Sequence, residues 1–382
     1  MFKKLFRVPP AGSIALVDTA LGGASGAPFP PRDYLLIDAK LGEKRWSDEE
    51  ALTERIAELV QRSISDRYPK PGTARRDAHP KSHGCVHAQF VVEPALPLSL
   101  AQGVFIPGVA YKAWLRFSNG NGDPTRPDSD GDGRGVGIKL MGVPGNKLLA
   151  SEVHANTQDF VLITHPTFFA DDPARYAALI ERGTSASAFV AATAPLALGW
   201  KGMWIAKKMR SKRIASPLEE RYWSTVPFSH GSGAGRRAVK YSIRPSVVGV
   251  STIPRNPRPD YLREAMEAAL ATGEAHFDFL IQVRVEGMSV EDSRVEWLEN
   301  EAPFVKVATI IIPSQIFNTP AQDAFGEALS FTPWHALPEH RPLGGVNRIR
   351  KVVYEAVSEL RHRLNGTERR EPTGDERFDP SE

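Results

Sequence analysis

Two long stretches of this chain consist of short runs rich in β-branched and aromatic residues, and Gly, Pro, Asn and Asp separate these runs. The first stretch covers residues 84–165 and contains HAQFVVEP, YKAWLRFSN, GVGIKLMGV and DFVLITHP. The second follows residue 235 and contains AVKYSIRPSVV, FDFLIQVRVEG and FVKVATIIIP. Such runs are typical of antiparallel strands joined by turns. The pattern predicts an α+β chain built on an antiparallel β-barrel with flanking helices.

Helical patterns lie before, between and after the strand-like runs. Residues 47–68 and the segment DYLREAMEAALATG carry apolar residues at helical spacing, and residues 172–235 form a helical stretch with turns. A last helix is predicted from Gly345 to Leu364. With 382 residues, 41% of them hydrophobic, the chain can bury a large core. We predict four parts: an N-terminal arm and helix (1–70), a barrel with inserted helices (71–315), a C-terminal helical segment (316–366) and a charged, disordered tail (367–382).

The charges of the chain are nearly balanced and interleaved, with 48 basic and 45 acidic residues. This balance creates no global field that would attract nucleic acid, so we predict no nucleic-acid partner. The single cysteine, Cys85, excludes an internal disulfide framework. Pro9 and Pro10 precede any apolar run long enough for a secretory signal. These features predict a cytoplasmic protein.

An uncharged stretch covers residues 183–200, and the basic run KKMRSKR follows it at 207–213. Ser, Thr, Gly and Pro195 dilute the apolar residues of this stretch too much for a membrane-spanning helix. We predict instead a helical hairpin or a flap that makes weak contact with a membrane surface. Such contact would make a cytoplasmic protein peripheral to a membrane.

The segment RRDAHPKSHGCVHAQF, residues 75–90, gathers three histidines and the only cysteine. Histidine and cysteine are the usual protein ligands of zinc. On a strand, His83, Cys85 and His87 would share one face, because successive side chains alternate. His79 precedes Pro80 and is therefore held in an extended or turn conformation away from that face. Zinc ligation, acid–base catalysis and an ordinary structural role all remain open for these residues.

The last predicted helix has an apolar stripe for packing and a second stripe beside it. On this second stripe, a tyrosine lies between two arginines. Arg350, Tyr354 and Arg361 lie on this neighbouring stripe. A location on the surface would explain the pattern, but guanidinium groups beside a phenol also stabilise its ionised form. A tyrosinate is one of the few oxygen donors that serve as a proximal haem ligand.

Five motifs, in this order along residues 75–365, resemble motifs of the haem catalase family. They are RRDAH, WLRFSN, DGRGVGIKL, QDFVLITHPTFF and RIRKVVY followed by an arginine. Each motif alone is weak, and their order makes the resemblance specific. The resemblance implies a barrel with haem b bound against one side and a C-terminal helix on the proximal side of its iron.

The resemblance also implies roles for individual residues. His79 would be the distal acid and base, and Ser118 would orient it. Tyr354 would bind the iron, with Arg350 beside it to keep the phenol deprotonated. The residues implied to bind the haem propionates are Arg76, Arg116 and Arg361.

Two residues and the length of the chain depart from the pattern of the family. Thr164 stands where the family has an asparagine amide on the distal side, so the task of positioning the distal oxygen would fall to its hydroxyl. Ala78 stands in place of the valine before the distal histidine. The chain is also too short for the longer wrapping segments or the extra C-terminal domain of the family. It therefore resembles the short, catalase-related branch, which is associated with peroxidase or fatty-acid hydroperoxide chemistry.

The leading hypothesis is a haem peroxidase that acts on hydrogen peroxide or on organic and fatty-acid hydroperoxides. It needs an electron donor that the sequence does not identify, and a homo-oligomer is left open. A non-catalytic haem carrier or sensor on the same barrel is the first alternative. A barrel without haem, whose histidine cluster holds zinc, is the second.

Overall fold

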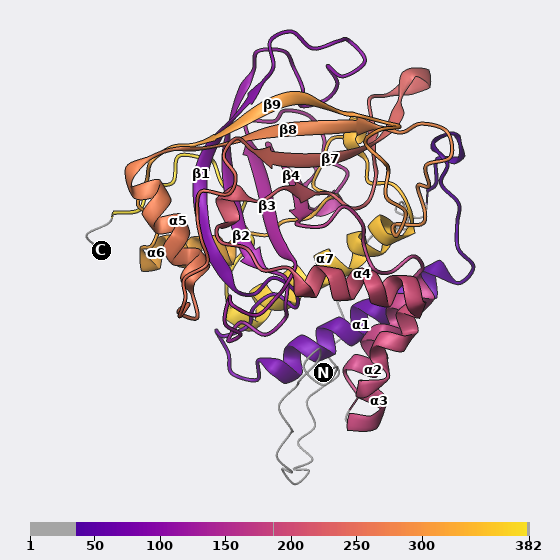
Figure 1. The fold of residues 1–382 in the computed structure, drawn as a ribbon. Helices are drawn as coiled ribbons and strands as arrows, with labels where there is room; N and C mark the ends of the chain where they lie inside the picture. Colours follow the sequence, from indigo (N-terminus) through magenta and orange to yellow (C-terminus); the bar gives the residue numbers. More distant parts are fainter. Residues whose placement is uncertain (1–35, 186, 380–382) are drawn as a thin grey trace.

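The structure is a computed structural model, and it describes residues 36–185 and 187–379. Most of the predicted N-terminal arm, with Pro9 and Pro10, lies outside the described residues. In the described part, β-strands form one sheet with seven α-helices and several short 3-10 turns around it (Figure 1). The turns are η3 (Ala39–Leu41), η4 (Ala150–Glu152), η5 (Ala194–Leu198), η6 (Pro217–Glu219), η7 (Gly233–Gly235) and η8 (Pro338–His340).

The sheet is antiparallel throughout and closes on itself. Its order is β5-β4-β3-β2-β1-β9-β8-β7-β6, and β5 also pairs with β7, so all strands except β6 form a closed ring. This closure confirms the predicted antiparallel β-barrel and the α+β class. The strands are β1 (Ser82–Val92), β2 (Ala110–Asn119), β3 (Arg134–Met141), β4 (Thr157–Ile163), β5 (Tyr222–Trp223), β6 (Phe228–His230), β7 (Arg237–Pro245), β8 (Ala275–Val283) and β9 (Phe304–Ile312).

The interior of the barrel is a packed core. Phe90, Phe160 and Phe279 lie at its centre with ring centroids 4.9–6.4 Å apart, and aliphatic side chains from every long strand surround them. Alternation along the strands then sends every second side chain to the outer face. On β2, Leu115 and Phe117 belong to this core, and their neighbours Arg116 and Ser118 therefore project outward. A functional site that uses these polar residues must lie outside the barrel.

Helices cover one end and one side of the barrel (Figure 1). The apolar stripe of α7 packs with α1 and α2 through residues such as Ile349, Leu360, Ile56 and Ala177. None of the helices in the described residues is long and apolar enough to cross a membrane. The helices are α1 (Glu49–Arg67), α2 (Pro173–Gly183), α3 (Ala188–Ala192), α4 (Gly199–Ser211), α5 (Tyr261–Thr272), α6 (Pro320–Ala328) and α7 (Gly345–Asn365).

The chain after α7 differs from the sequence-based expectation of a disordered tail. Residues 367–379 lie along the outer face of the barrel, where Glu376 accepts a hydrogen bond from Trp114 Nε1 at 3.0 Å. Glu371 pairs with Lys139 at 2.6 Å, and the Phe378 ring packs 5.2 Å from that of Phe325. A composition-based argument missed this because the partners lie on β2, β3 and α6, far away in sequence.

Candidate functional site

His79 lies just before β1, against Ser118 of β2 and Gly135 of β3. Its Nδ1 is 3.0 Å from Ser118 Oγ on β2. A Cβ atom on Gly135 of β3 would come within 2.4 Å of the imidazole, so only glycine leaves room for the ring there. The backbone of His79 has φ +62°, a left-handed conformation that is uncommon for residues other than glycine. Three separate segments therefore fix one orientation of this imidazole.

The surroundings of His79 favour the neutral imidazole. Desolvation, followed by the charges of Arg116, Arg76 and Arg350, lowers the pKa of His79 to about 3. Arg116 also donates a hydrogen bond from Nη1 to the carbonyl oxygen of His79 at 2.9 Å. At neutral pH this side chain is therefore uncharged, and one of its ring nitrogens has a free lone pair.

Three arginines that are distant in sequence converge on Glu327 in α6, two of them on its carboxylate and the third on its backbone carbonyl. Arg76 Nη1 lies 3.0 Å from Glu327 Oε1, and Arg116 Nη2 lies 3.3 Å from Oε2. Arg361 of α7 donates hydrogen bonds to the carbonyl oxygen of Glu327 and, at 3.1 Å, to that of Leu329. The structure thus brings together all three arginines that the sequence predicted to bind propionates. Glu327 was missed, because its partners come from three remote segments and no local motif marks it.

This arginine cluster has more positive than negative charge. Three guanidiniums face one carboxylate, which leaves two positive charges without a carboxylate partner in the cluster. Burial, followed by the charge of Arg76, lowers the pKa of Arg116 to about 10 and that of Arg361 to about 9. Burial alone would raise the pKa of Glu327, but the arginines hold it below its usual value. Arg116 Nε is buried without a hydrogen-bond partner among the described residues. The cluster is therefore suited to bind further carboxylates.

Tyr354 and Arg350 form a pair on α7. Arg350 Nη2 donates a hydrogen bond to the phenol oxygen at 3.1 Å, and its guanidinium carbon lies 5.0 Å from the centroid of the tyrosine ring. Asn347 holds Arg350 through a second hydrogen bond of 3.1 Å. A cation bonded to a phenol oxygen stabilises negative charge on that oxygen. The charge of Arg350 also lowers the pKa of His79, so the pair and the histidine border the same region.

Thr164 follows β4 and is buried. Its Oγ1 accepts a hydrogen bond from the backbone N–H of Arg134 at 2.9 Å, and its own N–H donates to the Arg134 carbonyl oxygen at 2.9 Å. Arg134 precedes Gly135, the residue that makes room for His79. Thr164 therefore lies beside the start of β3, which faces the His79 imidazole. Its hydroxyl accepts the last hydrogen bond between β3 and the end of β4.

The other residues of the histidine-rich segment have separate structural partners. His83 Nε2 is 2.7 Å from Asn119 Oδ1, and His83 is buried. Cys85 packs in an apolar cluster, and burial raises the pKa of its thiol to about 12. His87 contacts the edge of Trp114, with ring centroids 5.3 Å apart. In the described part of the chain, the ligand atoms of these three residues do not form a metal-binding group. The hypothesis of a zinc site on β1 is therefore not supported.

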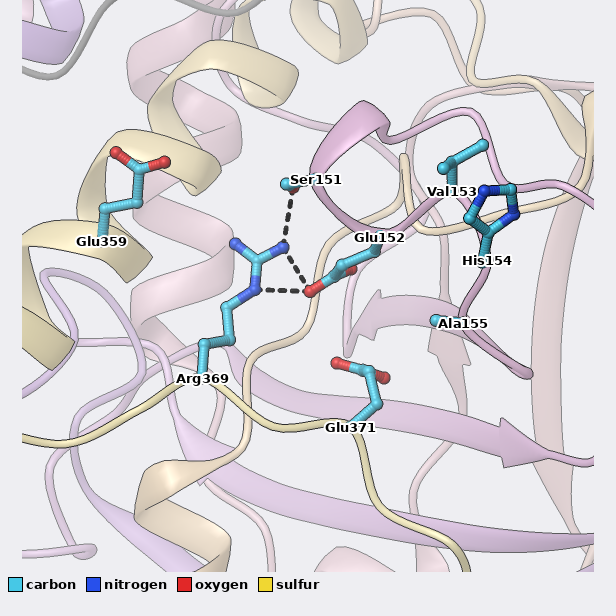
Figure 2. Close-up of a pocket in the computed structure, with 8 residues that line it drawn as sticks. All are labelled: Ser151, Glu152, Val153, His154, Ala155, Glu359, Arg369 and Glu371. Carbon is cyan, nitrogen blue, oxygen red and sulfur yellow. Dashed lines mark hydrogen bonds and ion pairs between the residues drawn. The ribbon is translucent and has the colours of Figure 1, made fainter.

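A second cluster of titratable residues lies beside a cavity of about 520 Å³ between η4 and the C-terminal tail (Figure 2). Glu152, His335 and Glu371 could place one ligand atom each within 4.8 Å of the others. These atoms already have partners, because Arg369 pairs with Glu152 and Lys139 pairs with Glu371. Burial opposes ionisation of Glu152, but the bond to His335 holds its pKa at about 2. The cluster is a compensated ion-pair network that fastens the tail.

Comparisons with known proteins concern the whole chain and its fold. No model of a protein family matches the chain. A curated "Catalase-related peroxidase" from Mycolicibacterium paratuberculosis is 25% identical over 277 residues, which cover 69% of this chain and 82% of the relative. The relative shares a quarter of the aligned residues, so the sequence relationship is distant.

Three solved catalases have the same fold as this chain. A fungal catalase matches 91% of the chain and 69% of its own length, with a TM-score of 0.59 and 17% identity. Catalase A from Saccharomyces cerevisiae matches 76% of the chain and 61% of its own length, at a TM-score of 0.57 and 19% identity. A bacterial catalase matches 93% of the chain and 68% of its own length, with a TM-score of 0.57 and 17% identity. We conclude that the chain has the fold of these catalases and is similar in sequence to a catalase-related peroxidase.

Proposed function

We propose that this chain is an oxidoreductase, a haem-dependent hydroperoxidase that acts on hydrogen peroxide or on organic and fatty-acid hydroperoxides. The observation that carries the proposal is the convergence of Arg76, Arg116 and Arg361 on Glu327, where three guanidinium charges meet one carboxylate charge. The name of the mycobacterial relative and the fold of the solved catalases support the same class of activity.

The residues present fit haem b. The two uncompensated positive charges of the arginine cluster match the two propionates of that cofactor, and buried Arg116 Nε has a free donor. Tyr354, with Arg350 bonded to its oxygen, has the donor chemistry of a proximal ligand. When bound, haem supplies the redox-active iron that breaks the O–O bond of a peroxide. In this proposal Arg76, Arg116 and Arg361 bind the propionates and Tyr354 binds the iron.

His79 moves the proton in the proposed reaction. In the tautomer whose Nδ1–H donates to Ser118 Oγ, Nε2 has a free lone pair that can take a proton from the substrate hydroperoxide. The same nitrogen can return this proton to the leaving oxygen. Ser118 fixes the ring through this bond, and Arg116 holds the His79 carbonyl. The low pKa keeps His79 neutral and ready to act as a base at neutral pH.

Thr164 suggests which substrate the site prefers. An asparagine amide could donate a hydrogen bond further into the site than a threonine hydroxyl that already accepts a bond from Arg134. The methyl group of Thr164 makes this side more apolar, and each buried methylene of a substrate contributes about 0.8 kcal/mol. Ala78, the other departure from the family pattern, is exposed. We therefore propose that hydroperoxides with a carbon tail are preferred over hydrogen peroxide.

The proposal includes a separate electron donor and a cytoplasmic location, and it is compatible with a homo-oligomer.

A haem carrier or sensor without peroxide turnover is the second candidate. One observation favours it: the bond from Arg134 N–H fixes the position of the Thr164 hydroxyl, so its O–H can reach a bound oxygen only in the remaining directions. The two candidates share the haem site and differ only in turnover, so one preparation can separate them.

Expression with a supply of haem tests the proposed function. We expect the purified chain to show a Soret band with ferric tyrosinate features, and to consume an alkyl hydroperoxide in the presence of a reducing dye. The same protein without haem is the control for consumption by the polypeptide alone. A haem spectrum without consumption would select the carrier. Failure to bind haem after reconstitution would contradict both candidates.

Replacement of Thr164 by asparagine tests the substrate preference. We expect Thr164→Asn to increase oxygen evolution from hydrogen peroxide, with unchanged haem content, because an amide can hold the second peroxide molecule. Oxygen evolution and loss of alkyl hydroperoxide are measured side by side. Thr164→Ser is the matched control, since it keeps the bond to Arg134 N–H and adds no amide. Fast oxygen evolution by the unaltered protein, with the same rate in the Thr164→Asn variant, would contradict this preference.

A further inference from the structure

The segment from α3 to α4 belongs to the group of helices below the barrel in Figure 1, and it carries several large exposed apolar side chains. Phe189 is 81% exposed, Leu196 61%, Trp200 83% and Trp204 56%. We call these four residues the α3–α4 surface. Trp200 and Trp204 lie one helical turn apart on α4, so their side chains project from the same face. Isolated exposed apolar residues are common, but a group with two tryptophans indicates a binding surface.

The opposite side of this segment is well packed. Ala194 and Leu198 are buried in a cluster with Leu179 of α2, and Ile205 of α4 is also buried. The segment is therefore a folded amphipathic unit with one side in the protein. Its exposed tryptophans are not the result of a missing local core.

Basic residues border the α3–α4 surface, and acidic ones are absent from the sequence around it. Between Gly183 and Arg213 the chain has six lysines and arginines and no aspartate or glutamate. Lys207 and Lys208 are exposed, and Lys208 Nζ lies 4.4 Å from the centre of the Trp204 ring. Aromatic side chains next to lysines are characteristic of helices that lie in the interface of an anionic membrane.

We propose that the α3–α4 surface binds the surface of a bilayer that contains anionic lipids. The aromatic and aliphatic side chains would enter the headgroup region, and the lysines would pair with lipid phosphates. A second copy of this chain fits less well, because lysine is depleted in protein interfaces and two such surfaces would bring like charges together. Anionic lipid supplies both an apolar layer and the opposite charge.

The C-terminal end of α4, the helix that carries Trp200 and Trp204, is close to the candidate site. A Cβ atom on Gly133 would lie 3.4 Å from Met209 of α4, and Gly131 packs against the carbonyl oxygen of Arg210. Gly133 is two residues from Gly135, which accommodates His79. If the proposed function holds, this placement brings lipid hydroperoxides near the site. The binding itself requires neither haem nor turnover.

Sedimentation with vesicles tests the proposal on the full chain. Vesicles of phosphatidylcholine with phosphatidylglycerol are compared with vesicles of phosphatidylcholine alone, at low and high salt. We expect binding to the anionic vesicles only, release by salt, and a blue shift of tryptophan emission. The double variants Trp200→Ser/Trp204→Ser and Lys207→Glu/Lys208→Glu should each reduce the bound fraction by about tenfold or more.

The control replaces exposed apolar residues elsewhere on the molecule. Leu98 is 87% and Val250 73% exposed, both lie outside the 183–213 segment, and Leu98→Ser/Val250→Ser should bind vesicles as the unaltered chain does. Thermal unfolding of every variant checks the fold. Absence of binding at low salt would overturn the proposal. Self-association that the tryptophan variant abolishes, without vesicle binding, would identify an oligomer interface instead. Neither readout depends on peroxide turnover, so failure of the proposed function leaves the test valid.

Discussion

Tyr354→Phe is expected to remove most of the bound haem and all of the tyrosinate spectrum, while the protein stays folded. The reason is that the phenol oxygen is the only atom lost, and the ring remains in its place on α7. Loss of partners that merely support a metal ligand already weakens metal affinity by about 10–100-fold, so loss of the ligand itself should cost at least as much. Haem content is measured by extraction, and the spectrum of the residual complex is recorded.

A second tyrosine serves as the control for this experiment. Tyr111 lies near the start of β2, far along the strand from Ser118. Its ring centroid is 6.5 Å from that of Phe90 inside the barrel. Tyr111→Phe should leave haem content and spectrum unchanged. Arg350→Leu should keep the ligand but alter the spectrum, because the bond of 3.1 Å to the phenol oxygen disappears. A tyrosinate spectrum that survives in Tyr354→Phe would exclude Tyr354 as the ligand.

His79→Ala is expected to lower the rate of reaction with peroxide by about 10²–10⁴-fold, the usual contribution of a general acid–base group. In free energy this is about 2.7–5.4 kcal/mol of the barrier. Haem content should change little, because His79 contributes no ligand to the iron in the proposed site. Rapid mixing with peroxide, monitored through the Soret band, measures the effect directly.

The other histidines of the segment separate catalysis from structure. His87→Ala and His83→Ala should each change the rate by less than about tenfold, or about 1.4 kcal/mol. His83→Ala should instead lower the free energy of unfolding by about 1–3 kcal/mol, because Asn119 loses a buried partner. Equal losses of rate in all three variants would favour a shared site on β1 over a single acid–base residue.

The pH dependence of the reaction follows from the low pKa of His79. The neutral imidazole is the active form, and it predominates at every pH above about 3. The rate should therefore be independent of His79 ionisation between pH 5 and 8, and it should fall only as the pH approaches 3, provided the protein is still folded. A rate that falls with a midpoint near 6.5, the value of a free histidine, would mean that the base is solvated.

The sequence predicted the barrel because alternation and turn residues are local signals that each strand carries separately. It also predicted that Arg76, Arg116 and Arg361 serve one purpose, and the structure places them around one carboxylate. That carboxylate, Glu327, could not be predicted, because its position depends on how α6 meets β2 and α7. The order of the C-terminal tail was missed for the same reason: Glu371 finds Lys139 across more than 200 residues of chain. Local patterns identify elements, and only the tertiary fold identifies their partners.

The closure of the barrel has a consequence for its dynamics. β5 is two residues long, and it joins β4 through the single pair Ile163–Trp223. On its other side, β5 pairs with β7, where Ser242 Oγ also donates a hydrogen bond to the Tyr222 carbonyl oxygen at 2.8 Å. With so few ladder bonds, this seam should open more often than the long pairs of β1, β2 and β3. Because Thr164 follows Ile163 directly, opening of this seam would shift the Thr164 edge of the proposed site on the outer face of the barrel, while the long strand pairs stay intact.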